Sequence, residues 1–101
     1  MTYELRILPS AESDLEDLFD YISSNSSRAR AVAYVQQLQA ACYALEEYPF
    51  RGRARDDLVP GLRSITVDRR AVVLYRIVEH VIEVAHIFYA GRNFTAEDFK
   101  Q

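Results

Sequence analysis

The sequence contains one cysteine, one lysine and no long apolar run. A single thiol, Cys42, cannot form an internal disulfide, so cysteine usage gives no sign of an oxidising compartment. The opening residues, MTYELRILPS, lack the basic and long apolar regions of a signal peptide, and no apolar stretch approaches the roughly 18 residues of a membrane span. These absences predict a cytoplasmic protein without a membrane segment.

The length and composition predict one folded domain. At 101 residues the chain is too short to bury two hydrophobic cores, so we expect a single domain over residues 1–101. A hydrophobic fraction of 50% with seven tyrosines is enough for a core, and a charged fraction of 27% excludes a low-complexity chain. The sequence also has no internal repeat.

Charge is divided between the two halves of the chain. Residues 1–26 carry six carboxylates and one arginine, a balance of 1 − 6 = −5, whereas residues 51–76 carry seven arginines and three aspartates, or 7 − 3 = +4. This division fits either an anionic partner for the basic segment or an intramolecular match between the halves. Every strong base except Lys100 is an arginine, which favours planar, bidentate contacts.

Two segments have the periodicity of amphipathic helices. The first is expected to begin at Ser10 as N-cap and to end in the polar run at residues 23–27. The second is expected to run from Ser27 as N-cap to Glu47. Their apolar stripes consist of Ala11, Leu15, Leu18, Phe19 and Ile22, and of Val32, Val35, Leu38, Cys42 and Leu45. A short link between them predicts a helical hairpin.

The remaining elements are strands rich in β-branched and aromatic residues. They are expected at residues 3–8, 62–67, 71–78 and 81–89, with a loop at 49–61 and a last helical turn capped by Thr95. We expect Tyr43, Tyr48 and Tyr75 to lie in the core. The order β-α-α-β-β-β predicts an α+β fold of two layers, in which the helical hairpin packs on a twisted antiparallel sheet.

No pattern of residues indicates a metal, cofactor or catalytic site. Asp14, Asp17 and Asp20 share a helical face, but no histidine or cysteine accompanies them, so a solvated face is favoured over a metal site. His80 and His86 have no evident triad partner in the sequence. The glycine-containing loop lacks the lysine of a phosphate-binding loop.

Taken in order, three stretches of the chain resemble the ParE/RelE superfamily of toxins from bacterial type II toxin-antitoxin systems. The stretches are ILPSAESDLEDLFDYI, LEEYPFRGRARDDLVPGLRSITV and VVLYRIVEHVIEVAHIFYAGRN. They are similar to the family's first helix, to its Leu-Pro-Gly run before a Gly-hydrophobic-Arg-Ser strand start, and to its last strands. The resemblance covers nearly the whole chain and implies the family's fold.

The superfamily includes two activities, and the resemblance implies one of them more strongly. RelE-type members cut messenger RNA on the ribosome with basic residues on the sheet, at positions that correspond here to Arg63, Ile65 and Val72, of which two are apolar. Tyr89 and Arg92 would have to replace the C-terminal acid and cation. The resemblance therefore favours the ParE type, which inhibits DNA gyrase and has no catalytic residue. A RelE-like endoribonuclease and an inactive relative that binds only an antitoxin remain the alternatives.

The resemblance also implies two binding surfaces and a partner. Target contacts are expected from Arg63, Arg69, Arg70, Tyr89 and Arg92. Antitoxin contacts are expected from Leu15, Leu18, Phe19, Ile22, Val35 and Leu38. The partner would be a ParD-like antitoxin with an acidic, amphipathic segment that folds on binding. The toxin alone is not expected to bind nucleic acid sequence-specifically.

Overall fold

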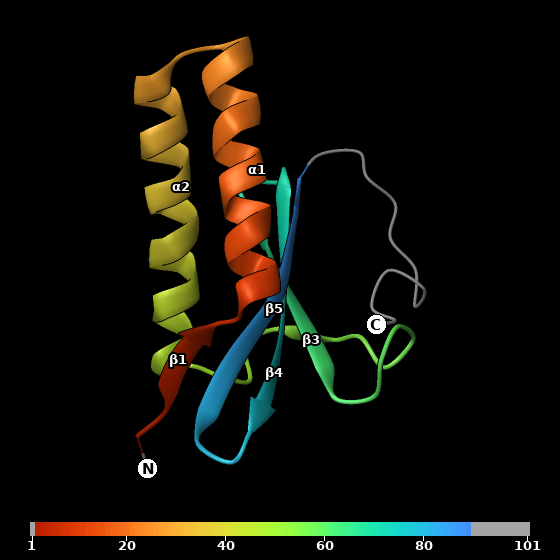
Figure 1. The fold of residues 1–101 in the computed structure, drawn as a ribbon. Helices are drawn as coiled ribbons and strands as arrows, with labels where there is room; N and C mark the ends of the chain where they lie inside the picture. Colours follow the sequence, from red (N-terminus) through yellow and green to blue (C-terminus); the bar gives the residue numbers. More distant parts are fainter. Residues whose placement is uncertain (1, 90–101) are drawn as a thin grey trace.

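Two antiparallel helices lie against one face of a five-stranded sheet (Figure 1). The structure is a computed structural model, and it describes residues 2–89. Its elements are β1 (Glu4–Ile7), α1 (Pro9–Asn25), α2 (Arg28–Tyr43), a 3-10 turn η1 (Ala44–Glu46), β2 (Arg53–Ala54), β3 (Leu62–Val67), β4 (Ala71–Val78) and β5 (Val81–Tyr89). The predicted α+β order is confirmed, and β2 is an additional short strand within the expected loop. The expected turn at Thr95 lies outside the described residues.

The sheet has the strand order β1-β5-β4-β3-β2. Strands β3, β4 and β5 form the predicted antiparallel meander, in which Val67 pairs with Ala71 and Val78 pairs with Val81. Strand β1 pairs with β5 in parallel, from Glu4 opposite Val81 to Ile7 opposite Val84. Periodicity identified β1 as a strand but did not specify its neighbour, since alternation reports which face is buried and not which strand lies alongside.

The two helices begin in different ways. Helix α2 begins after Ser27, whose side chain accepts a hydrogen bond from the Arg30 N–H at 3.2 Å, as predicted. The prediction of Ser10 as N-cap of α1 was wrong, because the extended residue Leu8 precedes the helix and Pro9 occupies its first turn. The Ser10 hydroxyl donates instead to the Ala85 carbonyl at 2.6 Å, which ties the start of α1 to β5.

The core lies between the helical hairpin and the sheet. From α2 and η1 it receives Ala31, Leu38, Cys42 and Leu45, and from the sheet it receives Val73, Tyr75, Ile82 and Val84, all of them buried. Burial raises the pKa of the Cys42 thiol to about 11. The first buried residue of α2 is Ala31, one position before Val32, where the predicted apolar stripe begins.

Three apolar residues expected in the core lie at the surface. Val32 is 38% exposed because Ala31, the residue before it, faces the core instead. The core-facing residues of this segment follow the helical spacing 31, 35, 38, 42 and 45. Tyr43 and Tyr48 are 54% and 67% exposed. A tyrosine suits an exposed position as well as a buried one, so residue type alone did not place them.

Tyr75, which was correctly expected in the core, holds the loop before β2. Its hydroxyl accepts a hydrogen bond from the Gly52 N–H at 2.9 Å and donates one to the Pro49 carbonyl at 2.8 Å. Arg63 completes this arrangement by donating to the carbonyls of Gly52 at 2.8 Å and Phe50 at 3.1 Å, with its guanidinium 5.2 Å from the centre of the Phe50 ring. A side chain at Gly52 would collide with the Tyr75 phenol, so only glycine fits there.

The substitution Tyr75→Phe tests the hydrogen bonds of this loop. It keeps the ring but leaves a buried N–H and a carbonyl without partners, which should lower the free energy of unfolding by about 1–3 kcal/mol. Urea unfolding at an unchanged m value measures the effect. Tyr48→Phe is the matched control at an exposed position and should change stability by less than about 0.5 kcal/mol. Equal midpoints for the two variants would show that the hydroxyl does not hold the loop.

Candidate functional site

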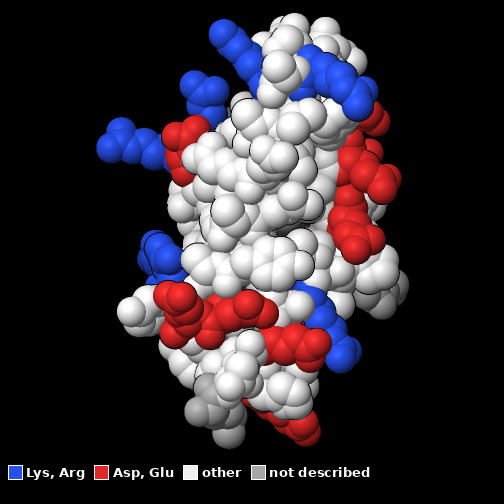
Figure 2. All heavy atoms as spheres, turned by 90° about the vertical axis from the view of Figure 1, so that its left-hand side faces the viewer, with Lys and Arg blue, Asp and Glu red and all other residues white. Residues whose placement is uncertain are grey.

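The outer side of α2 is an uncharged surface. Residues 31–45 contain no Asp, Glu, Lys or Arg, although much of this segment faces solvent. Figure 2 views the molecule from the side of the helices, and a broad area of uncharged side chains fills its centre, with charged side chains around it. We call the exposed residues of 31–45 the uncharged face. A solvent-facing helix usually carries charges, so this surface is suited to a partner.

A groove of about 480 Å³, here called the helix groove, runs between the two helices beside the uncharged face. It is lined by Ile7, Glu12, Leu15, Glu16, Phe19, Val35, Gln39 and Tyr43. Three of the six residues predicted to contact an antitoxin, Leu15, Phe19 and Val35, therefore share one groove. At its side the guanidinium of Arg28 lies 5.8 Å from the centre of the Phe19 ring.

The other three predicted antitoxin contacts lie elsewhere. Leu38 is fully buried in the core, Leu18 is buried against the sheet, and Ile22 is half-buried near the end of α1. Leu15 is also buried, so it forms the floor of the helix groove rather than an exposed contact. The apolar stripes of the helices thus serve mainly to hold the hairpin on the sheet.

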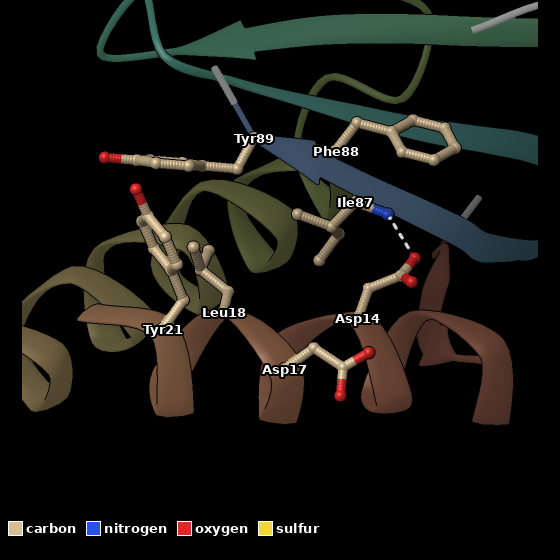
Figure 3. Close-up of a pocket in the computed structure, with 7 residues that line it drawn as sticks. All are labelled: Asp14, Asp17, Leu18, Tyr21, Ile87, Phe88 and Tyr89. Carbon is tan, nitrogen blue, oxygen red and sulfur yellow. Dashed lines mark hydrogen bonds between the residues drawn. The ribbon is translucent and has the colours of Figure 1, made fainter. Parts of the chain in front are cut away.

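A second pocket, of about 390 Å³, lies between α1 and the end of β5 (Figure 3). This acidic pocket is lined by Asp14, Asp17, Leu18, Tyr21, Ile87, Phe88 and Tyr89. The Asp14 carboxylate accepts a hydrogen bond from the Ile87 N–H at 2.9 Å and lies 3.2 Å from Nδ1 of His86. Asp14 thereby links α1 to the edge of the sheet, whereas Asp17 remains exposed.

A third pocket, of about 370 Å³, shares two tyrosines with the acidic pocket. This basic pocket is lined by Tyr21, Ile22, Asn25, Ser26, Arg30, Ala33, Tyr34, Gln37, Arg70 and Tyr89. The Tyr89 ring centre lies 6.2 Å from that of Tyr21 and 5.6 Å from that of Tyr34. The Tyr34 hydroxyl is buried and has no hydrogen-bond partner among the described residues. Burial raises the pKa of this hydroxyl, Tyr89 and Asp68 raise it further, and Arg70 opposes them.

The predicted target contacts divide between two places. Arg69 and Arg70 lie in the turn between β3 and β4, and Tyr89 is close to this turn because it pairs with Ala71. Arg63 lies near the opposite end of β3 and is hydrogen-bonded to the loop that Tyr75 holds. Arg92 lies outside the described residues. The structure therefore brings three of the five predicted residues together.

The turn at residues 68–70, here called the basic turn, has a strained backbone. Both Asp68 (φ 55°) and Arg69 (φ 57°) are in the left-handed region, and the Arg70 N–H closes the turn on the Val67 carbonyl at 3.2 Å. Glycine and asparagine are the usual residues in this conformation, and an arginine there costs about 1–2 kcal/mol. Arg69 and Arg70 are exposed, and neither forms an ion pair with a described residue.

The ion pairs decide between the two explanations of the divided charge. In the described part of the chain, Arg55 pairs with Asp57 at 2.9 Å and Arg76 pairs with Glu83 at 2.7 Å, both within the second half. None of the described ion pairs joins a carboxylate of α1 to an arginine of residues 51–76. The ion pairs of the described residues therefore give no direct match between the two halves, and the exposed Arg69 and Arg70 stay available to a partner.

The described residues contain no group of three or more His, Cys, Asp or Glu side chains arranged to hold a metal ion. Within the same residues, no helix is long and apolar enough to cross a membrane.

Tyr21, Arg30 and Tyr34 were not predicted to belong to any site, because two helices and a turn must meet before the basic pocket exists. The abundance of tyrosine was the one signal available in the sequence.

Comparisons with solved structures define the class of the fold. A chain of the chromosomal ParDE toxin-antitoxin system from P. aeruginosa superimposes with a TM-score of 0.79 at 22% identity, covering 88% of this chain and 97% of that one. A chain of the RelBE2 toxin-antitoxin complex from Mycobacterium tuberculosis gives a TM-score of 0.63 at 20% identity, covering 88% and 99%. The fold is thus shared with chains of two toxin-antitoxin systems.

Sequence comparison identifies the family within this class. Toxin ParE3 of Caulobacter vibrioides is 30% identical over 84 residues, which are 83% of each chain. The family described as the ParE toxin of the type II toxin-antitoxin system parDE matches residues 5–94. The chain belongs to this ParE toxin family, and the predicted ParE/RelE resemblance is confirmed.

The strain of the basic turn can be measured by substitution. Arg69→Gly removes the Cβ that disfavours the left-handed conformation and should raise the free energy of unfolding by up to about 1 kcal/mol, after the backbone entropy cost of glycine. Glu79→Gly, at φ 58° in the turn between β4 and β5, should have a similar effect. Arg69→Ala keeps the Cβ and should bring no gain. Chemical denaturation distinguishes these outcomes, and a loss of stability in both glycine variants would contradict the assignment of strain.

Proposed function

We propose that this toxin inhibits DNA gyrase by binding it through the basic turn, and that a ParD-like antitoxin neutralises it by covering the helix groove and the uncharged face. Membership of the ParE family supports the first part. The observation that carries the site is the basic turn, where two adjacent arginines are exposed and one of them, Arg69, occupies a backbone conformation that favours glycine. A strained backbone can mark a residue whose side chain is needed, and among the strained residues Asp68, Arg69 and Glu79 it is Arg69 that offers a cation for a contact outside the chain.

The basic turn has the chemistry of a protein contact rather than of a hydrolytic centre. Arg69 and Arg70 are adjacent and exposed, with Tyr89 beside them, and arginine and tyrosine are the residues that contribute most to protein interfaces. No group of three or more potential metal ligands accompanies them in the described part of the chain. We infer a binding module that acts on its target without a cofactor or catalysis of its own.

The alternative, a ribosome-dependent endoribonuclease, receives less support. Of the three sheet positions at which the RelE type carries basic residues, Arg63 donates to loop carbonyls and Ile65 and Val72 are half-buried apolar residues. Cleavage of RNA requires cations that converge on one phosphate. The described sheet offers no such group at these three positions. The second alternative, an inactive relative that only binds an antitoxin, is distinguished by whether induction arrests growth.

The helix groove and the uncharged face suit an amphipathic segment of an antitoxin. The P. aeruginosa structure is of a ParDE system, which supports a ParD-like partner for this chain. Apolar side chains of the partner would enter the groove against Leu15, Phe19 and Val35. An acidic residue of the same segment would face Arg28, whose guanidinium lies beside the groove at Phe19.

A gyrase supercoiling assay tests the target and the basic turn together. The purified protein should inhibit supercoiling and lead to cleaved DNA, and the antitoxin encoded beside it should reverse the effect. Combining Arg69→Gly with Arg70→Gln should reduce inhibition by roughly tenfold or more, because both cationic contacts are lost. Glu79→Gly, which changes the other strained turn, should inhibit like the parent. Full activity of the double variant would remove the basic turn from the site, and cleaved transcripts with unaffected gyrase would favour the endoribonuclease.

A charge placed on the uncharged face tests the antitoxin surface. Val32→Asp should weaken antitoxin binding about 100-fold, because the complex would bury an unpaired carboxylate. Val78→Asp is the matched control, since Val78 is 46% exposed against 38% for Val32 but lies at the end of β4. Isothermal titration calorimetry measures both affinities, and inhibition of gyrase by Val32→Asp should persist. Equal affinities of the two variants would place the antitoxin elsewhere.

A further inference from the structure

The basic pocket lies where four segments meet, and it contains Tyr21 and Tyr34, which belong to neither predicted binding surface. The end of α1, the part of α2 from Arg30 to Gln37, the basic turn and the last residue of β5 all contribute to it. It shares Tyr21 and Tyr89 with the acidic pocket, and Figure 3 shows these two side chains together at one end of that neighbouring pocket. Its volume of about 370 Å³ leaves room for more than a single side chain.

The charged residues that line this pocket are basic, and Asp68 of the adjoining turn lies outside the lining. Arg30 and Arg70 are its charged lining residues, and no described carboxylate lines it. Two guanidinium groups from separate segments offer the planar, forked donors that bind phosphate. The neighbouring acidic pocket is lined by the carboxylates of Asp14 and Asp17, which would repel an anion. An anionic ligand would therefore favour the basic pocket over its neighbour.

A buried donor in the same place lacks a partner. The Tyr34 hydroxyl is buried and forms no hydrogen bond with a described residue, although leaving such a group unsatisfied is destabilising. Tyr34 lines the same pocket as Arg70 of the basic turn. An acceptor brought by a ligand, after a small shift of the ring, would satisfy this hydroxyl.

The walls of the pocket suit a planar ring. Tyr21, Tyr34 and Tyr89 form a chain of aromatic contacts, with Tyr89 between the other two. Asn25 and Gln37 also line the pocket and can pair with the polar edge of a base. Aromatic side chains stack with any nucleobase, and arginine commonly accompanies them. A carboxylate side chain of a protein would use one arginine and would leave the rings and amides without contacts.

We propose that the basic pocket binds a nucleotide, with its phosphate held by Arg30 and Arg70 and its base against the tyrosine rings. Two sources carry this chemistry, a free mononucleotide and the terminal nucleotide of a nucleic-acid strand. The site shares Arg70 and Tyr89 with the proposed contact with gyrase and differs from it in requiring Tyr21, Arg30 and Tyr34, which do not belong to the basic turn. It requires no sequence-specific reading of DNA.

Calorimetry on the purified full-length chain tests the ligand class. Deoxyadenosine monophosphate should bind saturably and at least tenfold more tightly than either deoxyadenosine or inorganic phosphate. A short 5′-phosphorylated oligo(dA) separates the sources, because tighter binding than the mononucleotide indicates a strand end and equal or weaker binding indicates the free nucleotide. An acidic peptide that competes more strongly than the mononucleotide would overturn the proposal, as would a lack of saturable nucleotide binding.

Substitutions in the pocket test the residues. Arg30→Gln should weaken binding of the mononucleotide at least tenfold, whereas Arg76→Gln, on an exposed arginine of β4, should leave it unchanged. Tyr34→Phe should weaken binding severalfold and yet raise the melting temperature of the free protein, because it removes a buried hydroxyl without a partner. Equal binding by Arg30→Gln and Arg76→Gln would overturn the assignment. Inhibition of gyrase by Arg30→Gln should persist, so failure of this proposal and failure of the gyrase proposal are distinguishable.

Discussion

The early end of β1 determines how the helical hairpin meets the sheet. Pairing of β1 with β5 stops at Ile7 opposite Val84, because Pro9 follows and starts α1. The rest of β5 therefore has no strand on that side, and an open edge carries unpaired backbone groups. Side chains of α1 satisfy two of them, since Ser10 donates to the Ala85 carbonyl and Asp14 accepts from the Ile87 N–H.

The packing of α1 side chains, rather than a further strand, against the end of β5 also creates the acidic and basic pockets. Because α1 diverges along β5 instead of pairing with it, the space between them widens towards Tyr89, where the acidic and basic pockets adjoin. Pairing of Tyr89 with Ala71 brings the end of β5 to the basic turn. A short strand, a helix edge and a strained turn thus place carboxylates and guanidinium groups on either side of one pair of tyrosines, Tyr21 and Tyr89.

The sequence allowed prediction of those features that depend on local pattern. The Ser27 cap, the meander with its two turns and the buried Cys42 follow from residue type and periodicity, and the structure confirms them. Ser10 was misassigned because a serine near a helix start can cap the helix or bond to another element, and only the neighbouring strand decides which. Val32 was misassigned because the larger apolar residue was preferred to Ala31, although spacing favours the latter.

The candidate sites were predictable only in part, for a related reason. The basic turn is contiguous in sequence, so its arginines could be recognised together, whereas the basic pocket joins residues from positions 21 to 89. Arg63 shows the limit most clearly. Its position in a strand among other arginines suggested a recognition surface, but its guanidinium lies against the carbonyls of Phe50 and Gly52.

The arginines in the second half of the chain therefore fall into two groups, those bound within the fold and those left exposed. Arg63 fixes a loop, and Arg55 and Arg76 pair with nearby carboxylates, so their charges are locally compensated. Arg69 and Arg70 lack such a described partner, and Arg69 occupies a backbone that disfavours it. An unfavourable residue is retained most readily where its side chain acts on something outside the fold. The net charge of the segment is thus a poor guide to function, and the positions at which charge remains unpaired are a better one.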